Sequence, residues 1–518
     1  MSLIKNFASV GGATLLSRLL GFARDIMMAG ILGAGPVADA FVAAFRLPNM
    51  FRRILAEGVF NTAFIPLFAK AIEQKGEEEA KRLAANIISS LIYILIILTV
   101  LAEIFMPQLI LVLTTGFADD PEKFDLTVLL ARICFPYLAC MSLMAAYGAI
   151  LNGLRKFFIA ALAPTLLNVV LVPLLAYLII ASNDTVYSGY VISWGVLVGG
   201  VAQIGLVAWA LARTGYFPRL TLPKLDSGLK KFWALAIPAI LTGGVTQINI
   251  LVGTNIASAQ ESAIAYLYYA DRLYQLPLGM IGIAIGIVLL PELSRLLKSG
   301  QPEKAANVQE RSLFFGLLLT LPSAVALFVI AEPVIATLFQ RGAFDAEAAK
   351  QSAKALQIFA LGLPAFVLVK VFQPSYFARE DTRTPAIFAA VSVVLNIAFS
   401  LLMFPRLGHV GIAWATTISG WANVLMLVTT LAFWRELMLP KSIIGRVLSL
   451  LSVSLIMGII LFFAANYLAP QFIVEQLPLY WRSGALALLI VLGAASYFLM
   501  LHLFGIQRLG RWRDFIKS

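Results

Sequence analysis

The sequence predicts an all-α polytopic membrane protein with 14 transmembrane helices, built as two six-helix lobes related by a pseudo-twofold axis plus two C-terminal helices. Three observations support this fold class. The 518 residues are 60% hydrophobic and 13% charged, and the mean hydropathy is +0.90, which is far from soluble-domain values. Apolar segments long enough to cross a hydrocarbon core of about 30 Å recur from end to end. Short motifs also repeat between the two halves.

The apolar segments define the predicted spans and domains. The spans are residues 4–33, 37–70, 86–113, 125–151, 159–181, 188–213, 229–255, 262–296, 308–338, 352–378, 385–405, 410–434, 443–467 and 482–505. The predicted N-lobe is 1–222, the C-lobe is 223–438, and residues 439–518 form the last two helices and a tail. The first segment is not a cleavable signal peptide, because arginines interrupt its apolar run.

The lobe arrangement rests on the repeated motifs. The stretch FIPLF at 64–68 matches LLPEL at 289–293, an offset of 225, and Asn168 matches Asn396 at an offset of 228. A shift of six helices preserves orientation in the membrane. Duplicated bundles of this kind are typical of transporters, whose substrate sites lie between the repeats.

The loop charges predict the orientation, because Lys and Arg gather on the cytoplasmic side. Alternate loops are basic, for example 213–231 and 295–304, whereas the intervening loops 182–188 and 258–262 carry almost no basic residues. Both termini are therefore predicted to be cytoplasmic. The formal charge of +12 follows from this asymmetry and from the arginines within spans, so it gives no support for nucleic-acid binding.

Five arginines interrupt the predicted spans: Arg18, Arg24, Arg46, Arg52 and Arg272. Each would cost roughly 2.5 to 3.5 kcal/mol at mid-bilayer if it faced lipid, about 12 to 17 kcal/mol for the set. A water-filled cationic cavity avoids this cost and implies an anionic cargo. The guanidinium fork suits phosphate in particular, because it donates two parallel hydrogen bonds and keeps its charge.

Other charged residues share these spans and are further candidates: Asp25, Asp39, Asp271, Arg53, Glu57 and Lys370. They could line the cavity with the arginines, or they could form structural ion pairs between helices. Arg53 and Glu57 are four residues apart and could pair with each other. Lys370 could join the arginines or extend its amine to the membrane surface.

Helix-breaking residues concentrate in the two arginine-bearing segments. Six glycines lie between residues 11 and 35, and Leu47-Pro48-Asn49 predicts a break within the second span. Such helices could bend as gates, although glycine and proline are also common in membrane helices generally.

The sequence offers little for catalysis. It has two histidines, His409 and His502, and two cysteines, which read as packing thiols, and it lacks a P-loop. We therefore predict no enzyme activity, no metal and no cofactor. The acids Asp119, Asp120 and Glu122 resemble the metal-diphosphate site of a polyprenyl-linked glycosyltransferase only superficially, and we expect them to be solvated.

Four motifs carry a resemblance to a known family: SRLLGFARD at 17–25, FRLPNMFRRILAEG within 39–60, YADRL at 269–273 and AALAPTLLN at 160–168. Over nearly the whole chain they resemble the MurJ (MviN) proteins of the MOP exporter superfamily, which flip lipid II, the undecaprenyl-pyrophosphate-linked precursor of peptidoglycan. The resemblance implies a MATE-like fold. It also implies that the arginines corresponding to Arg18, Arg24, Arg52 and Arg272 line a central cavity, with acids at Asp25, Asp39 and Asp271 in or near it.

The resemblance further implies a lipid-tail groove between helices 13 and 14 and a portal between helices 1 and 8. Some members of the family bind sodium within the second lobe. We expect no such site here, because helices 7 and 11 carry Asn249 and Asn396 and show no clear acidic pair. The expected partners are lipid II, membrane lipids and the cell-wall synthesis machinery, and the expected energy source is the membrane potential, with or without a coupling cation. The alternatives are a flippase for another polyprenyl-pyrophosphate-linked oligosaccharide, a MATE-type cation-coupled drug exporter and a cell-wall scaffold.

Overall fold

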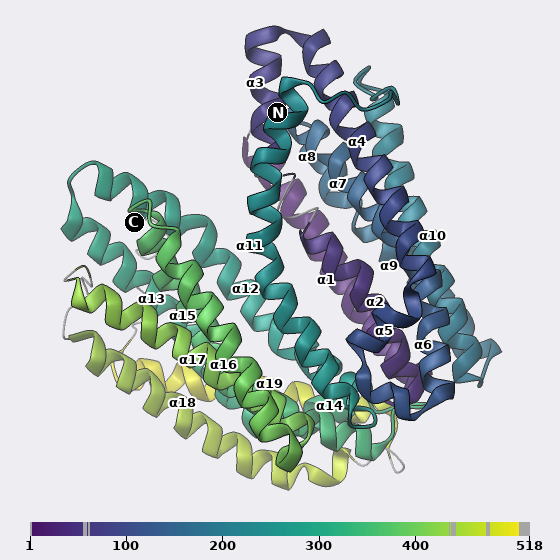
Figure 1. Cartoon of the computed structure of the whole chain (residues 1–518). Coiled ribbons are helices and arrows are strands. Elements are labelled where there is room, and N and C mark those ends of the chain that lie inside the picture. The colour runs from purple at the N-terminus through teal and green to yellow at the C-terminus, as the bar shows by residue number, and fades with distance from the viewer. Residues whose placement is uncertain are drawn as a thin grey trace. The chain divides into compact units, whose positions relative to one another are not determined.

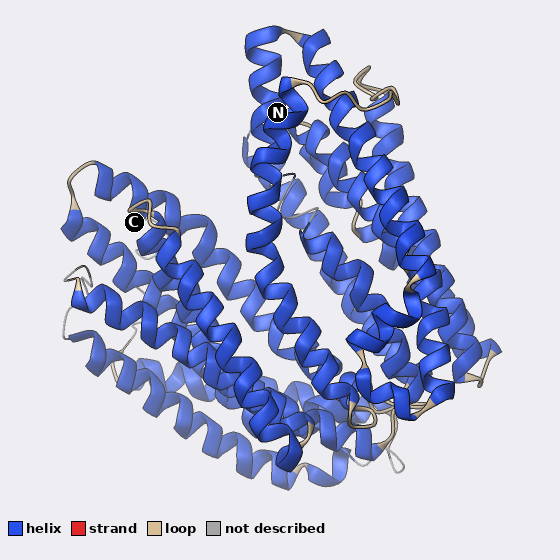
Figure 2. Ribbon diagram, in the orientation of Figure 1, coloured by secondary structure: helices blue, strands red, loops and turns tan. Residues whose placement is uncertain are grey.

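The fold is seen in a computed structural model that describes residues 3–54, 60, 63–434, 436, 442–472 and 477–506. Every regular element in these ranges is a helix, which confirms the all-α class (Figure 2). In chain order the elements are α1 (Leu3–Leu32), α2 (Pro36–Arg52), α3 (Ile65–Lys75), α4 (Glu77–Ile104), α5 (Met106–Leu113), η2 (Thr115–Asp119), α6 (Pro121–Cys134), α7 (Tyr137–Gly153), α8 (Phe157–Leu162), α9 (Thr165–Ala181), α10 (Thr185–Ala212), α11 (Ser227–Ser258), α12 (Ala263–Lys298), α13 (Pro302–Val329), α14 (Ala331–Phe339), α15 (Ala346–Phe377), α16 (Arg383–Leu407), α17 (His409–Phe433), α18 (Ser442–Tyr467), η3 (Ala469–Phe472) and α19 (Leu479–Leu503).

Ten helical stretches in the described part of the chain are long and apolar enough to cross a membrane: α4, α6 with α7, α8 with α9, α10, α13, α15, α16, α17, α18 and α19. For example, the 28 residues of α4 extend about 42 Å at a rise of 1.5 Å per residue, which exceeds a hydrocarbon core of about 30 Å. The chain is therefore a multi-span membrane protein. The charged helices α1, α2 and α12 are not among the ten, and the count of 14 stays a prediction.

Local chemistry explains where several helices begin. The side chains of Asp120, Asp184, Asp226 and Asp345 precede α6, α10, α11 and α15, and each accepts a hydrogen bond from a backbone N–H of the first turn. Such caps satisfy donors that have no partner within the helix. Asp120, predicted to be simply solvated, thus has a structural role in addition.

The predicted break at Pro48 is wrong. Helix α2 continues through Pro48 to Arg52, and the winding changes to π-type only at residues 53–54. Membrane helices tolerate proline where neighbouring groups satisfy the freed carbonyls.

The chain forms two compact units. Unit 1 comprises Met1–Ala265 with Gly342–Phe344, and unit 2 comprises Tyr266–Arg341 with Asp345–Ser518. In unit 1, α9 packs against α1 and α10, α2 packs against α6, and α11 contacts α4, α5 and η2 (Figure 1). In unit 2, α17 packs against α15 and α16, and α13 packs against α15 and α18. The predicted lobes, which concern an internal duplication, stay a prediction.

Two glycines, Gly30 near the end of α1 and Gly33 just after it, have a packing role in unit 1. The backbone N–H of Ala343 donates to the carbonyl of Gly30 over 2.9 Å. Gly33 has φ +67°, and a Cβ there would lie 2.9 Å from the carbonyl carbon of Ala343. A side chain at Gly33 would strain the backbone and collide with the 342–344 segment.

Candidate functional site

Arg24 on α1 is held by two side chains. Its Nε and Nη2 donate to Oδ1 of Asp25 over 3.0 and 2.7 Å, and its Nη1 donates to Oδ1 of Asn168 on α9 over 3.1 Å. The amide of Asn168 in turn donates to the carbonyl of Ser17 over 3.1 Å. Arg24 and Asp25 thus form an ion pair within α1, not between helices, and Asn168 fixes α9 to α1 at this point.

The two arginines of α2 are also oriented by neighbours. Nε of Arg52 donates to Oδ1 of Asn49 over 2.8 Å, one turn back along the helix. Nη1 of Arg46 donates to the hydroxyl of Thr254 on α11. The phenol of Tyr137 on α7 is buried and interacts electrostatically with both Arg52 and Arg24. The fold therefore brings the guanidinium groups of Arg24 on α1 and Arg52 on α2 near the same phenol.

Arg18 differs from Arg24, Arg46 and Arg52 in its surroundings. Its side chain is exposed, and it makes no hydrogen bond or ion pair within the described ranges. Six residues, or about 9 Å along α1, separate it from Arg24. Arg53 is exposed as well, while its proposed partner Glu57 lies outside the described residues. Of these four arginines, Arg18 is therefore the one best suited to meet an anion from outside the protein.

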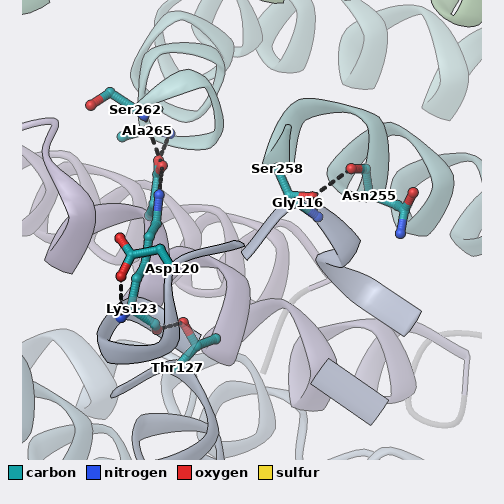
Figure 3. Close-up of polar contacts among 9 residues, drawn as sticks. Gly116, Asp120, Lys123, Thr127, Asn255, Ser258, Ser262 and Ala265 are labelled. Carbon is teal, nitrogen blue, oxygen red and sulfur yellow. Dashed lines mark hydrogen bonds and ion pairs between the residues drawn. The ribbon is translucent and has the colours of Figure 1, made fainter. Parts of the chain in front are cut away.

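Asp39 on α2 is fully buried and has protein partners on both carboxylate oxygens. Oδ2 accepts from Nζ of Lys123 over 2.8 Å and from the backbone N–H of Ser262 over 2.9 Å, and Oδ1 accepts from the N–H of Ala265 over 2.8 Å. Figure 3 shows Lys123 pointing from α6 toward the first turn of α12, where Ser262 and Ala265 lie. This carboxylate therefore stabilises the beginning of α12, through its charge and through two capping bonds.

Sequence reasoning missed Lys123, which is buried against Asp39 and lies 4.1 Å from the ring centroid of Phe117. The predicted span began at residue 125, which placed Lys123 outside it, in the outer loop that carries Asp119, Asp120 and Glu122. One signal was available, since a lone lysine in a loop predicted to face outward departs from the charge asymmetry. Next to this pair, Gly116 donates its N–H to Oγ of Ser258 over 3.0 Å (Figure 3).

Unit 2 carries the remaining candidates. Arg272 on α12 is half-buried, and its guanidinium lies 4.5 Å from the ring centroid of Tyr268, within cation–π range. The neighbouring Asp271 accepts a hydrogen bond from Gln275. Lys370 on α15 is exposed, and its Cγ would be 3.8 Å from a Cβ added at Gly282 of α12. Arg272 and Lys370 thus belong to adjacent helices of one unit.

These helices and their charges define a class of protein, the multi-helix membrane transporters with the MATE-type fold. A solved inward-facing MATE multidrug transporter of the MOP superfamily matches with a TM-score of 0.67 over 82% of this chain and 94% of its own, at 17% identity. A solved lipid II flippase MurJ in an inward closed conformation matches more fully, with a TM-score of 0.80 over 98% of this chain and 99% of its own, at 25% identity.

The sequence comparisons give the family. The model of the lipid II flippase MurJ family matches residues 28–482. A probable lipid II flippase MurJ of Rhizobium meliloti (strain 1021) is 48% identical over 96% of this chain and 93% of its own length, and one of Rhizobium tropici is 47% identical over 100% and 97%. The chain belongs to the lipid II flippase MurJ family, which confirms the resemblance carried by the four motifs.

Proposed function

We propose that this protein moves lipid II from the cytoplasmic to the periplasmic leaflet of the inner membrane. The observation that supports this most directly is the gathering of Arg24 and Arg52 around Tyr137, with the exposed Arg18 on the same helix as Arg24. Guanidinium groups in membrane helices suit a pyrophosphate headgroup. They do not suit the organic cations that a MATE-type drug exporter carries.

The mechanism we propose is alternating access between two six-helix lobes of a 14-span protein with both termini in the cytoplasm. The headgroup crosses in a hydrated cavity lined by Arg18, Arg24, Arg46, Arg52, Arg272 and Lys370. Asp25 and Asp271 orient the neighbouring arginines, and Asp39 holds the start of α12. The polyprenyl tail stays in lipid, along a groove between helices α18 and α19, and no covalent step is involved.

The membrane potential supplies a bias in this proposal. Moving one elementary charge through 100 mV is worth about 2.3 kcal/mol, so a pyrophosphate with roughly two negative charges gains up to about 4.6 kcal/mol on moving outward. When the cavity arginines neutralise the cargo, the potential acts mainly on the return of the empty, positive cavity. Collapse of the potential should then accumulate outward-facing carriers, which crosslinks on either side can count. Unchanged populations would contradict this part of the mechanism.

The function is tested by depletion in cells, with lipid II measured at the outer face by a membrane-impermeant probe. We expect exposure to fall on depletion and to recover with the wild type. Arg18→Ala and Arg272→Ala should fail to restore it at normal abundance, while Arg18→Lys should restore part of it because charge remains without the fork. Arg295→Ala is the matched control, because Arg295 is an exposed residue on the same helix as Arg272 that pairs with Glu292.

Two outcomes separate the cargo from the mechanism. Unchanged lipid II exposure on depletion, with other flippases excluded, would remove lipid II as the cargo. Full rescue by Arg18→Ala and Arg272→Ala at normal abundance would be compatible with lipid II as the cargo and would refute the cationic cavity. That second result is also what a cell-wall scaffold predicts for growth.

A further inference from the structure

Two arginines of unit 2 meet at the C-terminal end of α14. Nη2 of Arg341 donates to the carbonyls of Thr337 and Leu338 over 2.9 and 2.7 Å. Nη1 of Arg482, from the first turn of α19, donates to the carbonyls of Ala336 and Gln340 over 3.4 and 3.3 Å. Both cations therefore bind the negative end of one helix dipole, and the bonds of Arg482 are long.

Three donors in this cluster remain unsatisfied. Nε of Arg341, Nε of Arg482 and the hydroxyl of Thr337 are buried and have no hydrogen-bond partner among the residues that the structure describes. Arg482 is 5% exposed and Thr337 is 3% exposed, whereas Arg341 is half-buried, so the cluster has an edge at the surface. Buried donors without partners are rare in proteins and call for a ligand or water.

The charges of this cluster are also unbalanced. Neither Arg341 nor Arg482 forms an ion pair in the part of the chain that the structure describes, and each is close enough to act electrostatically on the other. The end of a helix carries only about half a negative charge. More than one positive charge is therefore left uncompensated at a largely buried position, which favours an anion.

We propose that Thr337, Arg341 and Arg482 form a phosphate-binding site, whose occupant is the phosphodiester headgroup of an anionic membrane lipid. Two guanidinium groups and a hydroxyl are typical donors to a tetrahedral phosphate. The lipid source is favoured by the residues just before Arg482, because Tyr480 is 69% exposed and Trp481 is 55% exposed. Exposed tyrosine and tryptophan at a helix end mark the headgroup level of a bilayer. The loop charges predict that this end faces outward, and the site is separate from the residues assigned to the cargo.

The test measures the thermal midpoint of the full chain in detergent during titration with phosphatidylglycerol, with diacylglycerol and with inorganic phosphate. Phosphatidylglycerol should raise the midpoint of the wild type, and diacylglycerol should not. Arg341→Gln and Thr337→Val should weaken the apparent affinity for phosphatidylglycerol about tenfold each, as expected for one lost hydrogen bond to a charged group. Thr337→Val keeps the side-chain volume and leaves both arginines bonded to the carbonyls at the end of α14. It therefore reports on the site even where Arg482→Gln fails to fold.

The matched control is Arg406→Gln, which removes an exposed cation from the same unit, near the end of α16. It should bind phosphatidylglycerol like the wild type. Equal affinity in all variants would overturn the site. Stabilisation by inorganic phosphate alone, lost in Thr337→Val and Arg341→Gln, would support the phosphate site and overturn the lipid as its occupant.

Discussion

Replacing Lys123 by methionine should destabilise unit 1 more than any exposed charge change. The substitution keeps the length and most of the apolar volume of the side chain but removes the cation from Asp39. The carboxylate would then remain fully buried with two backbone donors and no positive partner. Removing one member of a buried pair in this way leaves a charge that the protein interior cannot compensate.

The size of the effect follows from this geometry. Breaking a buried pair on one side costs about 3 to 5 kcal/mol, which lowers the folded-to-unfolded ratio roughly a hundredfold to several thousandfold. Adding Asp39→Asn removes the second charge. One amide oxygen then remains for two backbone donors, so the double variant should cost only about 1 to 3 kcal/mol. The double variant should therefore be more stable than Lys123→Met alone.

The assay is the thermal midpoint of the monomer peak in detergent, followed by fluorescence-detected size exclusion for the wild type, both single variants and the double variant. Lys81→Met serves as control, because Lys81 pairs with Glu77 and Glu78 at the surface, and its midpoint should not change measurably. A double variant less stable than Lys123→Met by the full cost of Asp39→Asn would refute the reasoning, because the two charges would then be independent.

Three further predictions concern local geometry. Gly116→Ala should lower the thermal midpoint, because the new Cβ would lie 2.5 Å from the backbone of Ala259; a wild-type midpoint would contradict this. Asn86→Ala removes three hydrogen bonds of 2.8 Å to the 224–226 segment, so amide exchange there should rise while exchange in α16 stays constant. Backbone N–H bonds, chiefly from Thr384, hold the pKa of Asp381 below its ordinary value. Its stabilising effect is therefore present above the ordinary pKa and lost as the pH falls through the folded pKa, and Asp381→Asn should flatten the acid limb of a midpoint-versus-pH curve.

The sequence was sufficient for the all-α class and for a chain with many membrane spans. Hydropathy locates apolar helices because the bilayer admits only segments that satisfy their own backbone, and arginines within such segments are costly enough to be informative. Partners were harder to predict. Lys123 is separated from Asp39 by 84 residues, and no local period connects them. The predicted break at Pro48 was wrong for a similar reason, because tertiary packing in a membrane protein can override the local preference of proline.

The two asparagines that the sequence matched between the halves both contact polar groups of another helix. Asn168 and Asn396 were matched only as equivalent positions, and both are buried. Asn168 binds Arg24 of α1, while Asn396 donates to the hydroxyls of Thr416 and Ser419 on α17. The same residue type thus joins two helices in each unit, with a charged partner in one and hydroxyl partners in the other.

The pairing of charges also determines how the membrane potential can act on the protein. Asp39 with Lys123, and Asp25 with Arg24, are neutral as pairs, so their movement through the field transfers no net charge. Arg18 is exposed and outside any ion pair in the described ranges, so its full charge remains available both to the field and to an anion. An anionic headgroup bound there would cancel the charge that the field acts on. In the mechanism that we propose, cargo binding and voltage sensitivity are therefore linked through the same guanidinium group.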